Sequence, residues 1–257
     1  MLEVREVTKI YNSGSVTEQC LFDSFSLSVE EGQFVSIVGS NGSGKTSLLN
    51  IICGSIPVES GDVLVGGESI LRKKDFQRYA AMGRVYQNPA MGTCPNLTML
   101  ENLSLADNKG KPFGFGRGVN KKRIGYYRAE LKGLGLGLED KLNVKMGALS
   151  GGQRQAVALL MATMTPLRFL ILDEHTAALE PKTAEVIMRL TDRVVREKGL
   201  TAMMVTHNLR CAVEYGDRLL MMDRGRAVLD RAGAEKENTS MEELLALFNK
   251  ISAECGI

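Results

Sequence analysis

GSNGSGKT, residues 39–46, is a glycine-rich string that ends in a lysine and a threonine. It fits the pattern Gly-x-x-x-x-Gly-Lys-Thr of a phosphate-binding loop. The apolar run FVSIV (34–38) precedes it and predicts a short strand, whereas KTSLLNIIC (45–53) predicts a helix that Gly54 ends. Strand, loop and helix start therefore follow one another in the order that phosphate binding requires.

The residue types of this loop suit different parts of a nucleotide. The amides of the turn and the positive end of the helix can bind the β-phosphate, Lys45 can reach the β and γ oxygens, and the Thr46 hydroxyl is a magnesium ligand. A turn that merely connects a strand to a helix would explain the glycines but not Lys45 and Thr46 directly after them. We therefore expect nucleotide contacts from Gly39, Ser40, Asn41, Gly42, Ser43, Gly44, Lys45, Thr46 and Ser47.

A second motif is FLILDE, residues 169–174, in which four apolar residues lead into two carboxylates. The run predicts a buried parallel strand, and ligands lie at the carboxyl ends of such strands in open α/β sheets. Asp173 is placed to hold magnesium through a water, and Glu174 to polarise the water that attacks the phosphate. The alternative is a helix cap, which the phosphate loop in the same chain makes less attractive.

Two single residues gain meaning from these motifs. TAMMVT (201–206) predicts another buried strand, which delivers His207 to the same sheet edge, where its imidazole could hydrogen-bond a γ-phosphate. Gln87 precedes Asn88 and a proline that breaks regular structure, so its amide could reach magnesium and the attacking water. A lone histidine is usually structural, and Gln87 by itself would be unremarkable.

LSGGQ, residues 149–153, opens a predicted helix over 151–164. Its first residues offer a hydroxyl, unobstructed amides and a helix dipole to an anion. We expect a second phosphate site at Ser150, Gly151, Gly152 and Gln153. The alternative is a serine N-cap followed by glycines that permit close packing.

With these motifs, residues 2–230 resemble the nucleotide-binding subunit of an ATP-binding-cassette (ABC) transporter. The resemblance implies a Walker A loop at 39–46, a Q-loop at Gln87, a signature at 150–153, the end of Walker B at Asp173 and Glu174, and a switch histidine at His207. The implied cofactors are ATP and Mg²⁺, with Glu174, His207 and Gln87 as catalytic residues and Thr46, Gln87 and Asp173 as magnesium ligands. Tyr11 would stack on adenine, although a plain surface aromatic stays open for a tyrosine in the turn-like stretch YNSGS.

In this family the signature contacts the γ-phosphate bound on the opposing subunit, so two chains arranged head to tail enclose two ATP molecules. We expect a homodimer that drives a separate integral membrane permease; a heterodimer with another cassette stays open. The D-loop, usually Ser-Ala-Leu-Asp, here reads AALE (177–180), which lengthens its carboxylate side chain by one methylene. DEHTAAL (173–179) is similar to a subgroup of importers that work with substrate-binding lipoproteins, some of them for aromatic amino acids.

The predicted fold class is α/β: a P-loop NTPase (RecA-like) core with an antiparallel β subdomain and an inserted helical subdomain. Alternation in residues 25–29 and strand pairs around residues 66–67 and 224–225 predict the antiparallel sheet. Capping boxes at 98–101 and 240–243 and a proline at 181 mark helix starts. The expected division is a single ABC ATPase domain over 1–257, with 1–87 and 155–235 as the core plus antiparallel subdomain, 88–154 as the helical subdomain with the signature, and 236–257 as the C-terminal helix.

Composition indicates an ordinary globular subunit. Hydrophobic residues make up 44% of the chain, and the net charge of +2 gives no general attraction to nucleic acid. Five cysteines without CxxC spacing indicate neither a zinc site nor a disulfide framework. The charged N-terminus lacks the apolar core of a signal peptide, and the longest apolar stretch, 156–172, is interrupted by polar residues. We expect a cytoplasmic location, peripheral on the inner face of the cell membrane, without a membrane span.

Residues 109–128 form the one local charge anomaly, with basic residues interleaved with aromatics and glycines. Such a stretch could form a nucleic-acid groove, a solvated loop and helix start, or a contact with anionic lipid or the permease. The near-neutral overall charge favours the solvated loop.

Three classes of function compete. A transport motor uses every motif; DEHTAAL and the absence of fused membrane spans favour import of a small solute, with an amino acid as the candidate, over an exporter ATPase. A soluble cassette ATPase acting on nucleic acid or ribosomes would carry inserted coiled coils, zinc-type cysteines or two cassettes. A GTPase switch would need Asn-Lys-x-Asp, but Asn120-Lys121-Lys122 is followed by Arg123. We therefore expect a permease and a substrate-binding lipoprotein as partners, and no nucleic acid.

Overall fold

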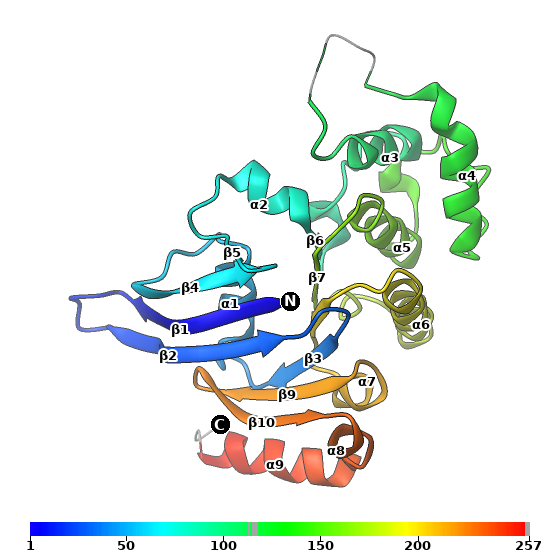
Figure 1. Ribbon diagram of the computed structural model, residues 1–257. Coiled ribbons are helices and arrows are strands. Elements are labelled where there is room, and N and C mark those ends of the chain that lie inside the picture. Colours follow the sequence, from blue (N-terminus) through cyan, green and yellow to red (C-terminus); the bar gives the residue numbers. More distant parts are fainter. Residues whose placement is uncertain (113, 115–117, 255–257) are drawn as a thin grey trace.

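The computed structural model describes residues 1–112, 114 and 118–254. Its framework is a six-stranded sheet with strand order β10-β9-β3-β8-β7-β6 and a four-stranded sheet with strand order β2-β1-β4-β5 (Figure 1). In the part of the chain that the structure describes, no helix combines the length and apolar character needed to cross a membrane.

The six-stranded sheet is built around β3 (Phe34–Gly39). On one side β3 pairs in parallel with β8 (Ala202–Val205), and on the other with β9 (Arg218–Asp223). β7 (Phe169–Asp173) continues the parallel sheet between β8 and β6 (Met82–Val85). The strands β3, β7, β8 and β9 are buried on both faces, which explains why they are almost continuously apolar.

Alternate residues of the core strands pack in two different layers. Val35, Ile37, Phe169 and Ile171 join the core that includes α1 (Lys45–Ile52) and the four-stranded sheet. Phe34, Leu170 and Leu172, which alternate with them along the strands, join a second core that includes the helices on the other side of the sheet in Figure 1. The period of two along a strand therefore assigns each side chain to one face.

The four-stranded sheet is antiparallel and contains β1 (Leu2–Tyr11), β2 (Gln19–Val29), β4 (Ser60–Val65) and β5 (Glu68–Ser69). The strand pair predicted around residues 66–67 is the β4–β5 hairpin of this sheet. The prediction that the pair around 224–225 belongs to the same sheet was wrong. That hairpin, β9 with β10 (Arg226–Ala232), extends the core sheet, because β9 pairs in parallel with β3.

The helix starts agree with their predicted capping signals. Thr98 and Glu101 form a capping box, Pro181 lies in the first turn of its helix, and the Ser240 hydroxyl accepts a hydrogen bond from the Glu243 amide. Apart from α1, the helices are α2 (Asp75–Ala81), α3 (Met99–Asp107), α4 (Ile124–Gly133), α5 (Gly151–Ala162), α6 (Pro181–Glu197), α7 (Leu209–Glu214), α8 (Ala234–Glu237) and α9 (Met241–Glu254), with 3₁₀ turns at Pro89–Met91, Lys121–Arg123 and Met146–Ala148.

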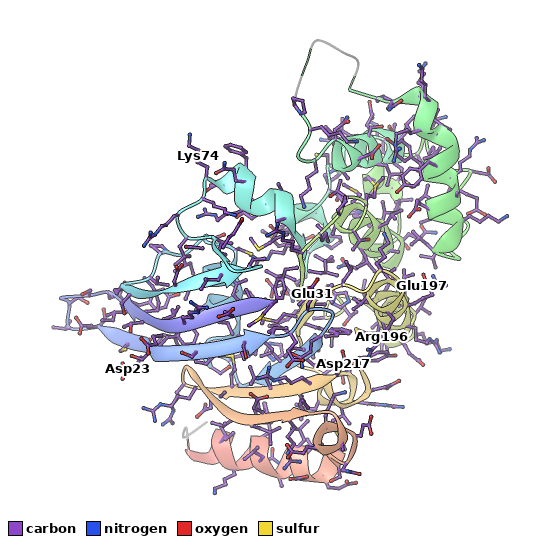
Figure 2. All side chains as sticks on the ribbon, viewed as in Figure 1. Asp23, Glu31, Lys74, Arg196, Glu197 and Asp217 are labelled. Atoms are coloured by element: carbon purple, nitrogen blue, oxygen red, sulfur yellow. The ribbon has the colours of Figure 1, made fainter. Side chains whose placement is uncertain are left out.

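Helices α3, α4 and α5 gather at one end of the molecule (Figure 1). α5 ends two residues before the predicted end, and it runs across the subdomain boundary expected between residues 154 and 155. At the other end of the helical layer, Arg196 of α6 donates to Asp217 at 2.6 Å, and the two residues lie side by side in Figure 2. Asp217 also accepts a hydrogen bond from the amide of Phe34, which joins α6 to the first residue of β3.

The described part of the basic stretch 109–128 makes contacts within the protein. Lys109 donates to the carbonyl of Met82 at 2.5 Å, and burial lowers its pKa to about 8. Arg123 pairs with Asp107 at 2.5 Å. Residues 113 and 115–117 of the stretch lie outside the described residues. These contacts give two of the basic residues a structural role.

Candidate nucleotide-binding site

The glycine-rich loop leaves β3 and turns into α1 with backbone angles that suit glycine. Gly42 and Gly44 have φ of 78° and 102°. At Gly39, a Cβ would lie 2.2 Å from the carbonyl oxygen of Met222 in β9, so a larger residue cannot fit without a backbone shift. The β9–β10 turn also contacts the loop, because the amide of Gly225 donates a hydrogen bond to the carbonyl of Ser43 at 3.0 Å.

The N-terminus of α1 has an open first turn. Gly44 is its N-cap, and no side chain of the described residues caps it. The first amides of a helix lack partners within the helix and carry partial positive charge, so they favour an anion. The loop and helix start are therefore suited to a phosphate group.

Lys45 lies folded against its own loop. Its ammonium donates to the carbonyls of Gly39 and Ser40, both at 2.8 Å, and to the Ser43 hydroxyl at 3.3 Å. The residue is 4% exposed; burial lowers its pKa below the usual value, and the nearby Glu174 carboxylate acts in the opposite direction. A buried ammonium held mostly by neutral carbonyls is well placed to accept an anionic partner.

Glu174 and His207 meet at the edge of the sheet where β7 and β8 end. His207 Nε2 lies 2.7 Å from Glu174 Oε1. Glu174 has a left-handed backbone with φ of 47°, and its amide donates to the carbonyl of Val205 in β8 at 2.9 Å. The neighbouring strand therefore fixes the turn that aims the carboxylate.

A cavity of about 270 Å³ lies between this pair and the phosphate loop. It brings together Tyr11 from the end of β1, the loop, Glu174 and His207; its lining is Tyr11, Gln19, Leu21, Asn41, Gly42, Gly44, Lys45, Thr46, Ser47, Glu174 and His207. Tyr11 ends a strand instead of lying within a turn, and its hydroxyl donates to Ser47 at 3.1 Å. The aromatic ring, the anion-binding amides and the carboxylate thus face one space.

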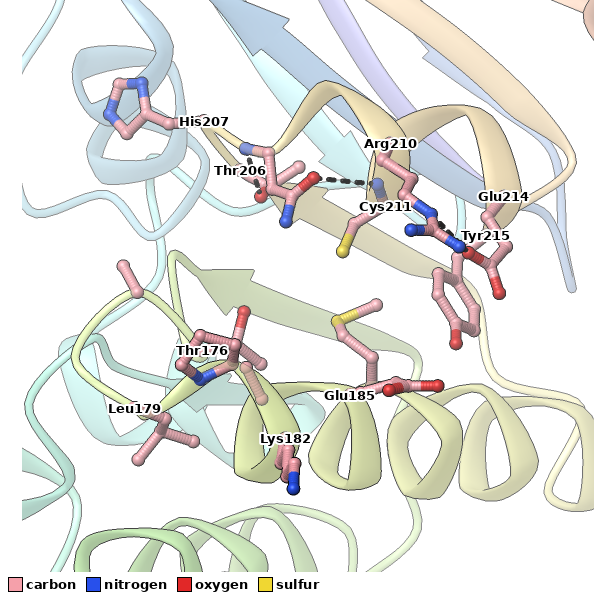
Figure 3. A pocket seen from close by; sticks show the side chains of 15 residues that line it. Thr176, Leu179, Lys182, Glu185, Thr206, His207, Arg210, Cys211, Glu214 and Tyr215 are labelled. Carbon is pink, nitrogen blue, oxygen red and sulfur yellow. Dashed lines mark hydrogen bonds and ion pairs between the residues drawn. The ribbon is translucent and has the colours of Figure 1, made fainter.

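A larger groove of about 690 Å³ lies beside it between α6 and α7 (Figure 3). Side chains of Lys182 and Glu185 from α6 lie opposite Arg210, Cys211 and Tyr215 on the α7 side. His207 borders both hollows, but the residues that line this groove include none from the phosphate loop. The smaller cavity is therefore the one with the chemistry for a nucleotide.

Several expected residues lie outside the lining of this cavity, namely Gly39, Ser40 and Ser43 of the loop, the carboxylate Asp173, Gln87, and Ser150, Gly151, Gly152 and Gln153. The side chain of Gln87 is exposed on the loop after β6. Ser150 and Gln153 form a capping box at the start of α5, with both hydrogen bonds at 3.2 Å. A Cβ on Gly152 would lie 2.3 Å from Thr183 Cγ2, so the capping and close packing considered for LSGGQ are both present.

Asp173 has a partner that the motifs did not indicate. Arg84 of β6 donates through Nη2 to Asp173 Oδ2 at 2.6 Å. In the sequence, Arg84 is a single cation among apolar residues in MGRVY, and only the pairing of β6 with β7 shows that it lies near Asp173.

The residues present fit ATP and magnesium. The open helix start and Lys45 suit phosphates, and the oxygens of Thr46, Asp173 and Gln87 are the kind that Mg²⁺ prefers. Among the described residues there is no cluster of three or more His, Cys, Asp or Glu that could hold a metal by itself. Mg²⁺ is commonly held by one or two carboxylates together with substrate phosphates, so a nucleotide would have to supply part of the coordination.

Comparisons with known proteins show the family of the chain. The ABC transporter family model matches residues 22–177. The chain is 44% identical over 248 residues to the tyrosine transport ATP-binding protein of Clostridioides difficile (strain R20291), covering 96% of this chain and 98% of that protein. It is 31% identical to the xylose/arabinose import ATP-binding protein XylG of Sulfolobus acidocaldarius, covering 98% of this chain and 95% of that protein.

Solved structures agree. The dimeric post-hydrolysis state of the ATP-binding cassette MJ0796, bound to ADP and Pi, is 31% identical and covers 90% of this chain and 98% of its own, with a TM-score of 0.75. A nucleotide-free cassette of an ABC transporter is 24% identical and shares the fold over 98% of this chain and 97% of its own, with a TM-score of 0.77. The chain therefore belongs to the ABC transporter family, as an ATP-binding subunit that hydrolyses ATP.

Proposed function

We propose that this subunit drives import of an aromatic amino acid, with tyrosine as the first candidate, through a separate permease. The 44% identity to a tyrosine transport ATP-binding protein over nearly the whole chain supports this substrate class. The string DEHTAAL at residues 173–179 points to the same importer subgroup, which works with substrate-binding lipoproteins. The subunit would be peripheral on the cytoplasmic face of the membrane.

The observation that carries the motor function is the placement of Glu174 and His207 opposite the phosphate loop across one cavity. Glu174 would accept a hydrogen bond from the attacking water, and His207 would hold the carboxylate and contact the γ-phosphate. Lys45 would exchange the carbonyls of Gly39 and Ser40 for phosphate oxygens. Tyr11 would stack on adenine.

Magnesium held by Thr46, Asp173 and Gln87 would neutralise charge on the β- and γ-phosphates. Asp173 is anchored by Arg84, whereas Gln87 lies on the exposed loop after β6. Gln87 would reach the cavity through movement of that loop.

A second copy would complete the site. Ser150, Gly151, Gly152 and Gln153 do not line the cavity of their own chain, and the related cassette MJ0796 has been solved as a dimer. In a head-to-tail homodimer, each signature would face the ATP on the opposing chain. The subdomain division would be the one expected from the sequence, with α5 shared between its helical and core parts.

Substitution of the two charged groups tests the motor assignment. We expect Glu174→Gln to bind ATP, to hydrolyse it at least about 100-fold more slowly and to accumulate as a dimer in ATP. Lys45→Ala should lose nucleotide binding, because the phosphates lose their buried cation. Phosphate release, nucleotide binding and light scattering would be measured, with Glu242→Gln on the exposed side of α9 as the matched control. Wild-type turnover by Glu174→Gln would exclude Glu174 as the water-polarising group.

Purification from native membranes tests the transport assignment. The tagged subunit, solubilised gently, should carry a multi-spanning protein and a lipoprotein, and the purified lipoprotein should bind tyrosine in calorimetry. A lipoprotein that binds another solute would refute the cargo but keep the motor. Recovery with ribosomes or nucleic acid alone would refute the transporter partnership.

A further inference from the structure

Arg84 is a cation on the face of the core sheet that packs against α1. In the parallel register, Arg84 lies opposite Ile171 of β7, and Ile171 belongs to the core beneath the four-stranded sheet. Asp173 follows Ile171 by two residues, so the period of two along a strand directs it to the same face. The fold thus places the arginine diagonally across from the last carboxylate of β7.

The Arg84 guanidinium joins three elements. Besides Asp173 Oδ2 at 2.6 Å, it donates to Asn50 Oδ1 of α1 at 2.9 Å and contacts Cys53 Sγ at 3.7 Å. It also lies over the ring of Tyr86, 4.7 Å from the centroid, and Tyr86 directly precedes Gln87. One side chain therefore contacts the Walker A helix, the Walker B carboxylate and the start of the Q-loop.

The pair is largely removed from water. The side chains of Arg84 and Asp173 are 13% and 15% exposed. A buried ion pair is weak evidence for stability, because desolvation offsets much of the attraction and apolar residues of similar volume often replace such a pair without loss. A fixed carboxylate orientation is a benefit that apolar residues could not supply.

We propose that Arg84 is a positioning residue for Asp173, and through it for magnesium. The hydrogen bond to Oδ2 fixes the rotation of the carboxylate and leaves Oδ1 to face the metal or its water. Asn50 in turn fixes the guanidinium. Because Asn50 lies on α1, the Asp173 carboxylate is oriented relative to the helix that begins at the phosphate loop. This inference rests on the proposed role of Asp173 as a magnesium ligand.

The test is a magnesium titration of nucleotide binding. Purified full-length chains would bind a fluorescent, non-hydrolysable ATP analogue at increasing Mg²⁺, with EDTA as the metal-free reference. We expect Arg84→Met to raise the half-saturating Mg²⁺ concentration by about 10- to 100-fold, the usual effect of losing a group that orients a metal ligand. Binding in EDTA should stay unchanged, because the phosphate loop is intact.

Two further variants sharpen the result. Arg84→Lys keeps the charge but cannot serve Asp173 and Asn50 with one planar fork, so we expect an intermediate shift. Asp173→Asn should shift the magnesium requirement at least as far as Arg84→Met. Thermal unfolding of every variant would report loss of fold separately from loss of magnesium coupling.

The possible outcomes distinguish the positioning role of Arg84 from the magnesium role of Asp173. A lower melting temperature for Arg84→Met with an unchanged magnesium requirement would leave Arg84 a purely structural role. A lower magnesium requirement would show that Arg84 competes with the metal instead of positioning its ligand. An unchanged requirement in Asp173→Asn would refute the magnesium role of Asp173 itself, whereas a shift in Asp173→Asn alone would refute only the role of Arg84.

Discussion

His175 is the buried neighbour of Glu174 in the sequence, and its ring holds the turn after β7 against α6. It is 1% exposed, and its Nε2 lies 3.0 Å from the Thr191 hydroxyl. That hydroxyl donates to the carbonyl of Ile187, so it accepts a hydrogen bond from Nε2 of a neutral imidazole. Burial lowers the pKa of His175 from 6.5 to about 4.

This histidine makes the fold sensitive to acid. The unfolded chain takes up a proton near pH 6.5 and the folded chain only near pH 4, so the stability contribution is complete above pH 6.5 and is lost as the pH falls toward 4. We expect the free energy of unfolding to fall by roughly 3 kcal/mol more in the natural chain than in His175→Gln over that range. Urea unfolding at several pH values measures the free energy of unfolding of both chains. A difference between the two chains that does not change with pH would contradict the prediction.

The sequence predicted candidate residues where a motif fixes their spacing. The glycine-rich string and FLILDE led to Lys45 and Glu174, which the structure brings to one cavity, because each string joins a structural signal to a chemical one. Arg84 had no such string, and its partner Asp173 lies 89 residues away. Only the register between β6 and β7 brings them together, and the local sequence does not predict the register between strands that are distant in the chain.

At the scale of elements, the contact between α5 and α6 depends on Gly152. A Cβ added there would lie 2.3 Å from Thr183 Cγ2 in the first turn of α6. Such overlap requires a shift of one helix or a change of side-chain rotamer. Helix α5, which begins with the signature, and helix α6, which follows the D-loop, therefore pack closely at this point.

We expect Gly152→Ala to destabilise the protein by about 1 to 3 kcal/mol, because the overpacking cost exceeds the gain in helix propensity. Thr183→Ser removes the methyl group in question, so it should restore most of the lost stability when combined with Gly152→Ala. Urea unfolding of both single variants and the double variant gives the coupling energy. Additive effects would show that the two positions do not share this contact.

Elements were predictable where their signals are local. Pro181 was predicted to mark a helix start, and α6 begins at that residue. The hairpin of β9 and β10 was recognised around Arg224 and Gly225, but its sheet was not. Its neighbour β3 lies far back in the chain, and hydrophobic alternation does not name a partner strand.

At the scale of the whole molecule, one variant in the signature and one in the phosphate loop can test whether a site is formed by two different chains. Gly151 is the first residue of α5, where an aspartate is favoured by the helix dipole but would repel a phosphate. A Cβ there would lie 3.4 Å from Leu179 Cδ2, so the first carbon of a side chain fits without overlap. Gly151→Asp should therefore fold normally and fail in hydrolysis.

Mixing Gly151→Asp with Lys45→Ala should restore activity. In a head-to-tail dimer, one composite site receives both defects and the other receives neither. With equal amounts and independent sites, we expect about one quarter of the wild-type rate, because half the dimers are mixed and each has one intact site. Phosphate release by the mixture measures this, with Gly151→Ala as the uncharged control; a mixture as inactive as its parts would contradict composite sites that work independently.

The position of β3 between β8 and β9 has a consequence for how the protein is made. The strand that leads into the phosphate loop is synthesised long before both of its neighbours and before Gly225, whose amide contacts the loop. Distant pairings of this kind slow folding and leave apolar strands exposed in the nascent chain. We therefore expect ATP to stabilise the chain only after β8, β9 and the β9–β10 turn have been synthesised.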